Sequence, residues 1–261
     1  PADVIAGFSD EYIEYMQGGL YRASYRPLND AIIAGRIRGA VGVVGCNNPR
    51  VCQDSVSNFL VRELIKNDVL VLQTGCTAHA SAKAGYLTPE NALENAGPGL
   101  REVCEAIGIP PVLHFGSCVD NSRILTIASH IAEEGGLGDD IGGLPAVGIA
   151  PEWMSEKAIA IGTYFVASGV PIIFGAGNPI SASKTLKDIM ESKWWDMLNA
   201  GFYFEDDPGK ILELTLKLID AAREKLKIRK YEQGAFGTER VLMDMAARRA
   251  ATFATPHGVD V

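Results

Sequence analysis

The sequence predicts an α/β fold with a doubly wound, mainly parallel sheet and helices on both faces. Two patterns support this prediction. Short runs of four or five nearly all apolar residues recur along the chain, as is typical of parallel strands that are covered on both faces. Amphipathic stretches separate these runs, and strands that alternate with helices form βαβ units. The sequence therefore predicts one wound α/β domain.

Six segments are expected to be strands. Each of the first five follows or precedes a loop marked by Gly or Pro. The last alternates more in polarity than the others, so it is expected at the edge of the sheet. In chain order the predicted strands are 40–44 (AVGVV), 69–72 (VLVL), 112–115 (VLHF), 146–149 (AVGI), 170–174 (VPIIF) and 202–205 (FYFE).

The predicted helices lie between and after these strands. Apolar residues recur in them at helical spacing, with a Ser at the start of the first and an Asp-Pro pair opening the last. We expect helices over 55–66, 100–107, 122–134, 154–167, 182–198 and 208–226. An Arg- and Ala-rich stretch over 232–252 predicts one more helix. The expected organisation is a domain over 1–230 followed by a helical tail over 231–261.

Composition limits the classes of function. The 261 residues are 47% hydrophobic and 21% charged, as in soluble globular proteins. The formal net charge of −8 argues against a nucleic-acid-binding surface, whose affinity comes from Lys and Arg. No apolar run is long enough to span a bilayer, and the first residues do not resemble a signal peptide, so we expect a cytoplasmic protein.

Three cysteines follow the predicted strands in a similar context. Gly45 and Gly75 directly precede Cys46 and Cys76, and a Gly-Ser pair precedes Cys118. Because the carboxyl ends of parallel strands meet at one edge, these thiols are expected there together. Thiolates are ligands for soft metals and iron–sulfur clusters. Three thiolates cannot complete a four-iron cubane, so further ligands would have to come from elsewhere.

The same residues also have simpler interpretations. A Gly-Cys pair after a strand is often a turn glycine and a small buried residue. Cys52 and Cys104 lack the strand context and are predicted to be core or spare thiols. His79 and His114 lie close in sequence to the site cysteines and are either structural or able to donate a proton toward the site.

Lys157 follows the fourth predicted strand at the start of an apolar helix. A desolvated lysine there could stabilise a developing anion, and the alternative is an exposed lysine beside Glu156. The chain contains no GxGxxG, P-loop, GxSxG or HExxH motif.

Four segments resemble the anaerobic nickel–iron carbon monoxide dehydrogenases. They are 42–50 (GVVGCNNPR), 68–87 (DVLVLQTGCTAHASAKAGYL), 114–123 (HFGSCVDNSR) and 150–162 (APEWMSEKAIAIG). The resemblance runs in order from about residue 20 to about residue 228. The hybrid-cluster (prismane) proteins share the architecture and are the nearest family to distinguish.

The resemblance implies an active-site cluster of the Ni–Fe4–S4 type that interconverts CO and water with CO2, two protons and two electrons. By motif, Cys46 and Cys76 would each bind an iron of the cubane, and Cys118 would bind the nickel. Lys157 would hydrogen-bond an oxygen of CO2, and Ile161 would form part of the apolar wall over the nickel.

The resemblance also implies that this chain is the Rossmann-like, C-terminal portion of a longer enzyme. The further 4Fe–4S clusters, the other ligands of the active cluster and the proton-relay histidines have no counterpart here. Expected partners are that N-terminal part or a partner chain, a ferredoxin-like electron acceptor, and in some members acetyl-CoA synthase; family members are homodimers. Two alternatives stay open: a portion of a hybrid-cluster hydroxylamine reductase, and an isolated domain that folds without metal.

Overall fold

A six-stranded sheet organises the protein, and all of its strands are parallel. The computed structural model describes residues 4–153 and 155–234, and the strand order is β3-β2-β1-β4-β5-β6. The strands are β1 (Gly39–Val43), β2 (Val69–Gln73), β3 (Val112–His114), β4 (Ala146–Ala150), β5 (Ile172–Phe174) and β6 (Phe202–Phe204). The doubly wound prediction is confirmed, and β6 lies at the edge as expected, paired in parallel with β5.

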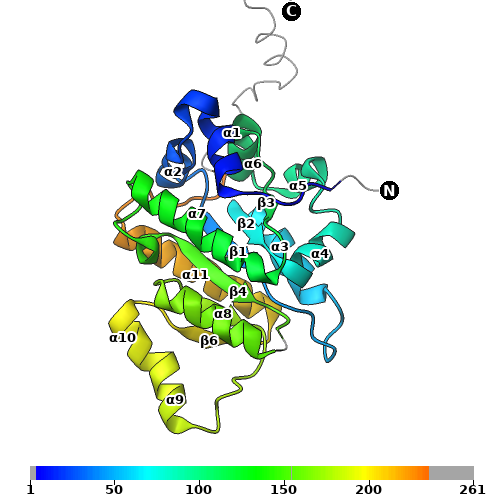
Figure 1. Ribbon diagram of the computed structural model, residues 1–261, viewed down its shortest axis with the longest axis vertical. Helices are drawn as coiled ribbons and strands as arrows, with labels where there is room; N and C mark the ends of the chain where they lie inside the picture. The colour runs from blue at the N-terminus through cyan, green and yellow to red at the C-terminus, as the bar shows by residue number, and fades with distance from the viewer. Residues whose placement is uncertain (1–3, 154, 235–261) are drawn as a thin grey trace, which may run out of the picture.

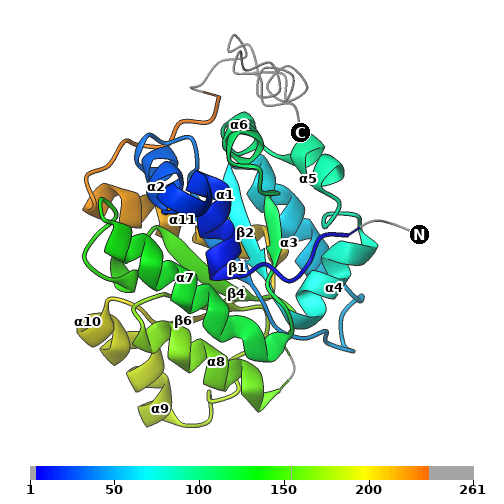
Figure 2. The same ribbon diagram turned by 45° about the horizontal axis from the view of Figure 1, so that its top comes forward.

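Helices cover both faces of the sheet (Figures 1 and 2). Helices α2, α7 and α8 lie over one face, while α3 and α11 pack together over the other. The helices are α1 (Asp10–Arg22), α2 (Arg26–Ile33), α3 (Ser55–Lys66), α4 (Gly75–Lys83), α5 (Pro89–Asn95), α6 (Pro98–Ile107), η1 (Cys118–Asp120), α7 (Asn121–Glu134), η2 (Ile141–Gly143), α8 (Glu156–Ala167), α9 (Lys184–Asp188), η3 (Ile189–Lys193), α10 (Trp194–Leu198) and α11 (Pro208–Lys225). In the described part of the chain no helix is long and apolar enough to cross a membrane.

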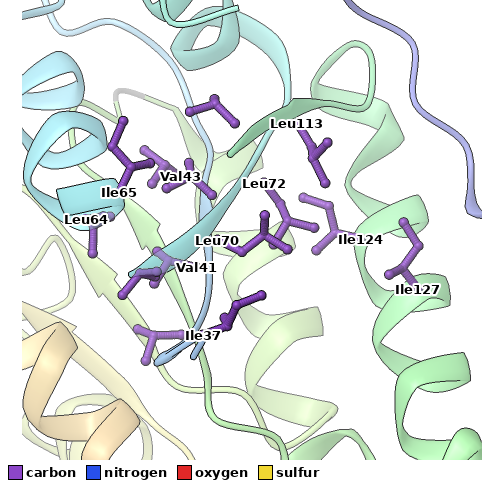
Figure 3. Close-up of a cluster of buried hydrophobic side chains, with 14 of the residues drawn as sticks. Ile37, Val41, Val43, Leu64, Ile65, Leu70, Leu72, Leu113, Ile124 and Ile127 are labelled. Carbon is purple, nitrogen blue, oxygen red and sulfur yellow. The ribbon is translucent and has the colours of Figure 1, made fainter. Parts of the chain in front are cut away.

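The core explains why the strand segments are almost wholly apolar. Successive residues of a strand point to opposite faces, and both faces are covered, so both sets must be apolar. Figure 3 shows Val41 and Val43 beside Leu64 on α3, while Leu72 lies on the side of Ile124 on α7. Each of these side chains is at most 7% exposed. Burial of one such side chain contributes about 1.5–3 kcal/mol, so the strand positions are set by packing.

Several helix predictions need correction. The helix predicted over 182–198 is divided into α9, a π-helical turn (η3) and α10. Helices α1, α2, α4 and α5 were not expected from the sequence pattern. Helix α1 contains a kink at Gly19, whose φ is +70°, and α2 is only eight residues long, so neither shows a long regular apolar stripe.

The predicted tail helix over 232–252 falls outside the described residues from 235 onward. The division at residue 230 stays a prediction.

Candidate metal centre

The candidate site lies where the winding of the sheet changes direction. Strands β1 and β4 are neighbours although two strands separate them in sequence, so the connections from β1 and β4 run to opposite sides. The loops at such a switch point diverge and leave a crevice outside the carboxyl ends of the strands. Cys46 follows β1, and Lys157 follows β4 at the start of α8. The crevice therefore contains two of the predicted site residues.

A small cavity of about 20 Å³ brings four of the five predicted site residues together. Cys46, Cys118, Lys157 and Ile161 all line it, together with Asn121. The Lys157 ammonium Nζ lies 3.5 Å from Cys118 Sγ and donates a weak hydrogen bond to it. Ile161 is partly buried and packs against the main core one helical turn beyond Lys157. Lys157 itself is exposed, so the strongly desolvated lysine considered from the sequence is not what the structure shows.

Cys76 lies beside this cavity without lining it. It is the second residue of α4, and its side chain is exposed. The preceding Gly75 donates its N–H to the carbonyl of Gly116 at 2.9 Å, which joins the Cys76 turn to the Cys118 turn. Gly75 has a φ of +61°, and a Cβ there would lie 3.2 Å from Cys118 Cβ. Only glycine allows the two cysteine turns to approach this closely without strain.

Two of the three cysteines lie in the first turn of a helix. Cys76 is the second residue of α4, and Cys118 begins η1 directly before α7. Such a position directs the backbone N–H groups of the first helical turn toward the region of the thiol. Cys46 differs, because it lies in an irregular loop nine residues before Ser55, where α3 begins.

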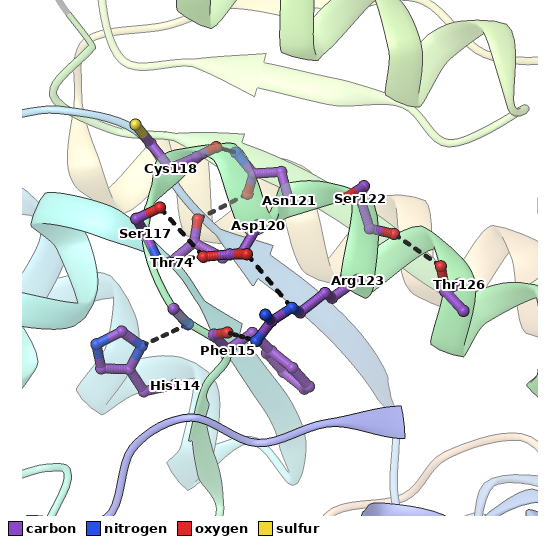
Figure 4. Close-up of polar contacts among 11 residues, drawn as sticks. Thr74, His114, Phe115, Ser117, Cys118, Asp120, Asn121, Ser122, Arg123 and Thr126 are labelled. Carbon is purple, nitrogen blue, oxygen red and sulfur yellow. Dashed lines mark hydrogen bonds and ion pairs between the residues drawn. The ribbon is translucent and has the colours of Figure 1, made fainter. Parts of the chain in front are cut away.

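The turn that carries Cys118 is held by local hydrogen bonds, which Figure 4 shows. The backbone N–H and the hydroxyl of Ser117 both donate to Asp120 Oδ2, at 2.7 and 3.1 Å. These bonds, the backbone one first, lower the pKa of the Asp120 carboxyl below its ordinary value. Arg123 pairs with Asp120 and donates to the carbonyl of Phe115 at 3.0 Å. The turn is thus fixed on both sides of Cys118.

His114 supports the same turn and does not point to a catalytic role. Its Nδ1 accepts a hydrogen bond from the N–H of Gly116 at 3.0 Å, so the neutral ring carries its proton on Nε2. Partial burial lowers the pKa of His114; the nearby Asp120 carboxylate opposes this and His79 adds to it, and the net shift is downward. His79 is exposed on α4. The structure favours the structural interpretation of His114.

Glu152 is a residue of this region that the sequence analysis did not single out. Its side chain is fully buried at the end of β4. One carboxylate oxygen accepts from the N–H groups of Val56 and Ser57, at 3.0 and 3.3 Å. The other accepts from the N–H of Asp54 and the side-chain amide of Asn47, at 3.2 and 3.3 Å. Glu152 therefore caps the start of α3 and ties the β4 loop to the loop of β1.

The contacts of Asp54 extend this connection to the end of helix α4. Asn47, next to Cys46, donates to Asp54 Oδ1 at 2.6 Å. Lys83, the last residue of the helix that opens with Gly75 and Cys76, forms an ion pair with Asp54. Polar side chains thus join the loops after β1 and β4 to each other and to the C-terminal end of α4.

The two remaining cysteines, Cys52 and Cys104, differ in burial. Cys104 is 1% exposed on α6, and burial raises the pKa of its thiol, as expected of a core residue. Cys52 is exposed in the loop before α3, so it is not part of the core. All five cysteines are free thiols.

The candidate donors are thiols, the ligand type that iron–sulfur clusters take. Within residues 4–153 and 155–234, no three His, Cys, Asp or Glu side chains lie close enough together to hold one metal ion. The three thiols lie at one edge of the sheet, each on a separate turn after a strand. Thiolates arranged in this way suit a polynuclear centre in which each sulfur binds a different metal atom.

Comparison with known proteins identifies the family of the chain. Residues 4–209 match the model of the Prismane/CO dehydrogenase family. Carbon monoxide dehydrogenase 1 of Methanosarcina mazei is 49% identical over 224 residues, which cover 86% of this chain and 35% of that protein. A Ni-free crystal structure of carbon monoxide dehydrogenase from Thermococcus sp. AM4 has a TM-score of 0.80 at 47% identity, covering 87% of this chain and 35% of that one.

A third similar structure has a TM-score of 0.77 at 33% identity and covers 88% of this chain and 37% of that one. It is described as NiZn[Fe4S4] and NiNi[Fe4S4] clusters in closed and open alpha subunits of acetyl-CoA synthase/carbon monoxide dehydrogenase. The chain spans about 35% of the length of the curated relatives it matches most strongly. With a family match over most of its residues, the chain belongs to the Prismane/CO dehydrogenase family.

Proposed function

We propose that this chain is the portion of an anaerobic nickel–iron carbon monoxide dehydrogenase that supplies three cysteines and one lysine to the active-site cluster. The reaction of the whole enzyme is CO + H2O to CO2 + 2 H⁺ + 2 e⁻. The observation that carries the proposal is the 3.5 Å contact between Lys157 Nζ and Cys118 Sγ, in a cavity that Cys46 and Ile161 also line. Two elements far apart in sequence bring a thiol and a cation together at the switch point of the sheet.

The roles of the residues follow from their chemistry. When bound, a nickel–iron–sulfur cluster supplies the metal site for CO and CO2 and accepts the two electrons. Cys46 and Cys76 would each hold an iron, and Cys118 would hold the nickel. The exposed ammonium of Lys157 would stabilise negative charge on an oxygen of CO2, an electrostatic contribution that is often the largest one in catalysis. The Ile161 side chain would exclude water beside it.

The proposal includes partners outside this chain. Another segment or chain would supply the remaining ligands and the additional 4Fe–4S clusters, and a ferredoxin-like protein would accept the electrons. One relative, from Moorella thermoacetica, is named carbon monoxide dehydrogenase/acetyl-CoA synthase subunit beta, so an acetyl-CoA synthase partner belongs to the same proposal. The cytoplasm of an anaerobe is the expected setting.

Complementation tests the proposal directly. The chain would be produced without oxygen, with nickel and iron, together with the N-terminal two thirds of the Methanosarcina mazei relative. CO-dependent dye reduction and bound nickel and iron would be measured. We expect activity in the wild type, none in Cys118→Ala, and a loss of about 100-fold or more in Lys157→Ala, because removal of one electrostatic donor costs about that much. The matched control is Cys52→Ala, which changes an exposed thiol and should keep full activity.

Three results would contradict the proposal. Full activity of Cys118→Ala would remove the nickel role of Cys118. Hydroxylamine reduction without CO oxidation would favour the hybrid-cluster alternative. A folded complex that binds no nickel or iron would favour a metal-free scaffold.

A further inference from the structure

Three buried polar residues lie directly beneath the cysteine turns. Thr74 and Thr77 are fully buried, and Asn121 is 3% exposed. They lie among apolar strands and helices, where an unmade hydrogen bond costs about 1–3 kcal/mol. Their hydrogen-bond partners therefore show which segments these side chains hold together.

The hydrogen bonds of these residues form one chain. Thr77 Oγ1 lies 2.8 Å from the carbonyl oxygen of Val43, at the end of β1, and 2.9 Å from that of Thr74. Thr74 Oγ1 donates to Asn121 Oδ1 at 2.7 Å. The Asn121 amide Nδ2 then donates to the carbonyl of Cys118 at 2.8 Å, as Figure 4 shows.

This chain of bonds touches each of the three cysteine turns. Val43 lies three residues before Cys46, and Thr74 lies two residues before Cys76. The third contact is made to Cys118 itself. Asn121 also lines the cavity that contains Cys46 and Cys118. Side chains thus link the ends of β1 and β2 to the turn after β3 through groups that water does not reach.

We propose that Thr74 and Asn121 are positioning residues that fix the spacing between Cys76 and Cys118 before any metal binds. The identity of the cluster in this inference rests on the proposed function. A site that is already ordered loses no binding free energy to the ordering of its ligand loops. A fixed spacing of the thiols also favours a cluster of one size.

The inference differs from a simple role in stability. A residue that only stabilises the core would, when changed, lower the stability of the whole chain and leave the folded state equally ordered. A positioning residue would loosen the cysteine turns selectively in a protein that stays folded. Thr74→Ser, which keeps the hydroxyl, should behave as the wild type.

Nuclear magnetic resonance of the metal-free chain labelled with ¹⁵N-cysteine separates the two roles. The five cysteines give five backbone amide signals, and Cys104 in the core serves as an internal reference. Order parameters and relaxation dispersion would be measured for wild type, Thr74→Ser, Thr74→Val and Asn121→Ala. The matched control is Thr126→Val on the exposed side of α7, which loses only a bond to the carbonyl of Ser122.

In the wild type we expect order parameters of about 0.85 at Cys76 and Cys118, as in rigid backbone. In Thr74→Val and Asn121→Ala these values should fall below about 0.6, or millisecond exchange should appear, while Cys104 stays rigid. Thr74→Ser and Thr126→Val should match the wild type. The test needs neither metal nor CO, so its result is independent of the proposed function.

Three results would overturn the inference. One is mobile cysteine turns in the metal-free wild type. Another is unchanged order at Cys76 and Cys118 in both loss-of-bond variants. The third is that neither Thr74→Val nor Asn121→Ala folds while Thr74→Ser does, because the bonds would then serve the stability of the whole fold.

Discussion

Replacement of Glu152 by Gln tests whether the buried Glu152 carboxylate holds the loop after β4 to the loop after β1 and the start of α3. The carboxylate is fully buried and accepts four hydrogen bonds, from the N–H groups of Asp54, Val56 and Ser57 and from the side chain of Asn47. Gln has nearly the same shape, but its NH2 group donates. Two of the four donors would therefore face another donor.

The magnitude can be estimated from these contacts. A hydrogen bond to a charged group contributes about 1.5–3 kcal/mol, so the loss of two gives about 3–6 kcal/mol. Loss of the negative charge at the start of α3 adds about 0.3–1 kcal/mol. Since the variant no longer has to bury a charge, the lower end applies, and we expect destabilisation of about 3 kcal/mol. For a chain of this size that lowers the Tm by about 6–12 °C.

Urea and thermal unfolding of the metal-free chain, followed by circular dichroism, would measure this loss. Glu156→Gln is the matched control, because Glu156 is exposed in the first turn of α8, where the change should cost no more than about 1 kcal/mol. If Glu152→Gln lost no more stability than Glu156→Gln, the carboxylate would not connect the loops as described.

Two further predictions concern the strands and the Cys118 turn. Gly42→Ala should stabilise the chain by about 0.5–1 kcal/mol in urea unfolding, because its methyl group would enter an apolar core cavity of about 60 Å³. Gly39→Ala should instead destabilise it by about 1–3 kcal/mol, because its Cβ would meet the carbonyl oxygen of Pro145. Burial lowers the pKa of His114 below its ordinary value near 6.5. The neutral ring accepts the hydrogen bond from the Gly116 N–H, so the stability from this bond is fully present above pH 6.5 and is lost as the pH falls through the lowered pKa. The Gly116 amide shift, followed from about pH 8 to about pH 4, should titrate below 6.5; a midpoint at or above 6.5 would contradict this.

The strands and their ends could be predicted because their signal is local. A run such as VLVL at the start of β2 must be buried on both faces wherever it lies, and parallel strands then bring their carboxyl ends to one edge. That reasoning alone was enough to expect Cys46, Cys76 and Cys118 near one another. The cavity confirms the proximity of Cys46 and Cys118, while the catalytic roles of all the site residues stay predictions.

Features that depend on distant partners could not be predicted in this way. Glu152 caps a helix whose first residues lie about a hundred positions earlier in the chain, so no local pattern marks it. Helix α4 (GCTAHASAK) is built mainly of small residues without an apolar stripe, and Thr77, Ala78, Ala80 and Ser81 are buried in it because α3 and the turn of Cys118 pack against it. Tertiary packing, which the sequence does not display, determines both features.

The geometry of the sheet also explains why such a chain would supply only part of a cluster. All six strands are parallel, so every loop that follows a strand leaves the same edge, and ligands on those loops approach a bound group from one side. A cluster with several metal atoms needs ligands on all sides, and its far side has to be covered by another segment. The surface next to the cysteines fits such a cover: Val119, which follows Cys118, is 73% exposed, and Cys76 is exposed as well. Under the proposed function, the exposed Cys76 would face the segment or chain that supplies the remaining ligands, because a thiol at this edge meets a bound cluster from one side only.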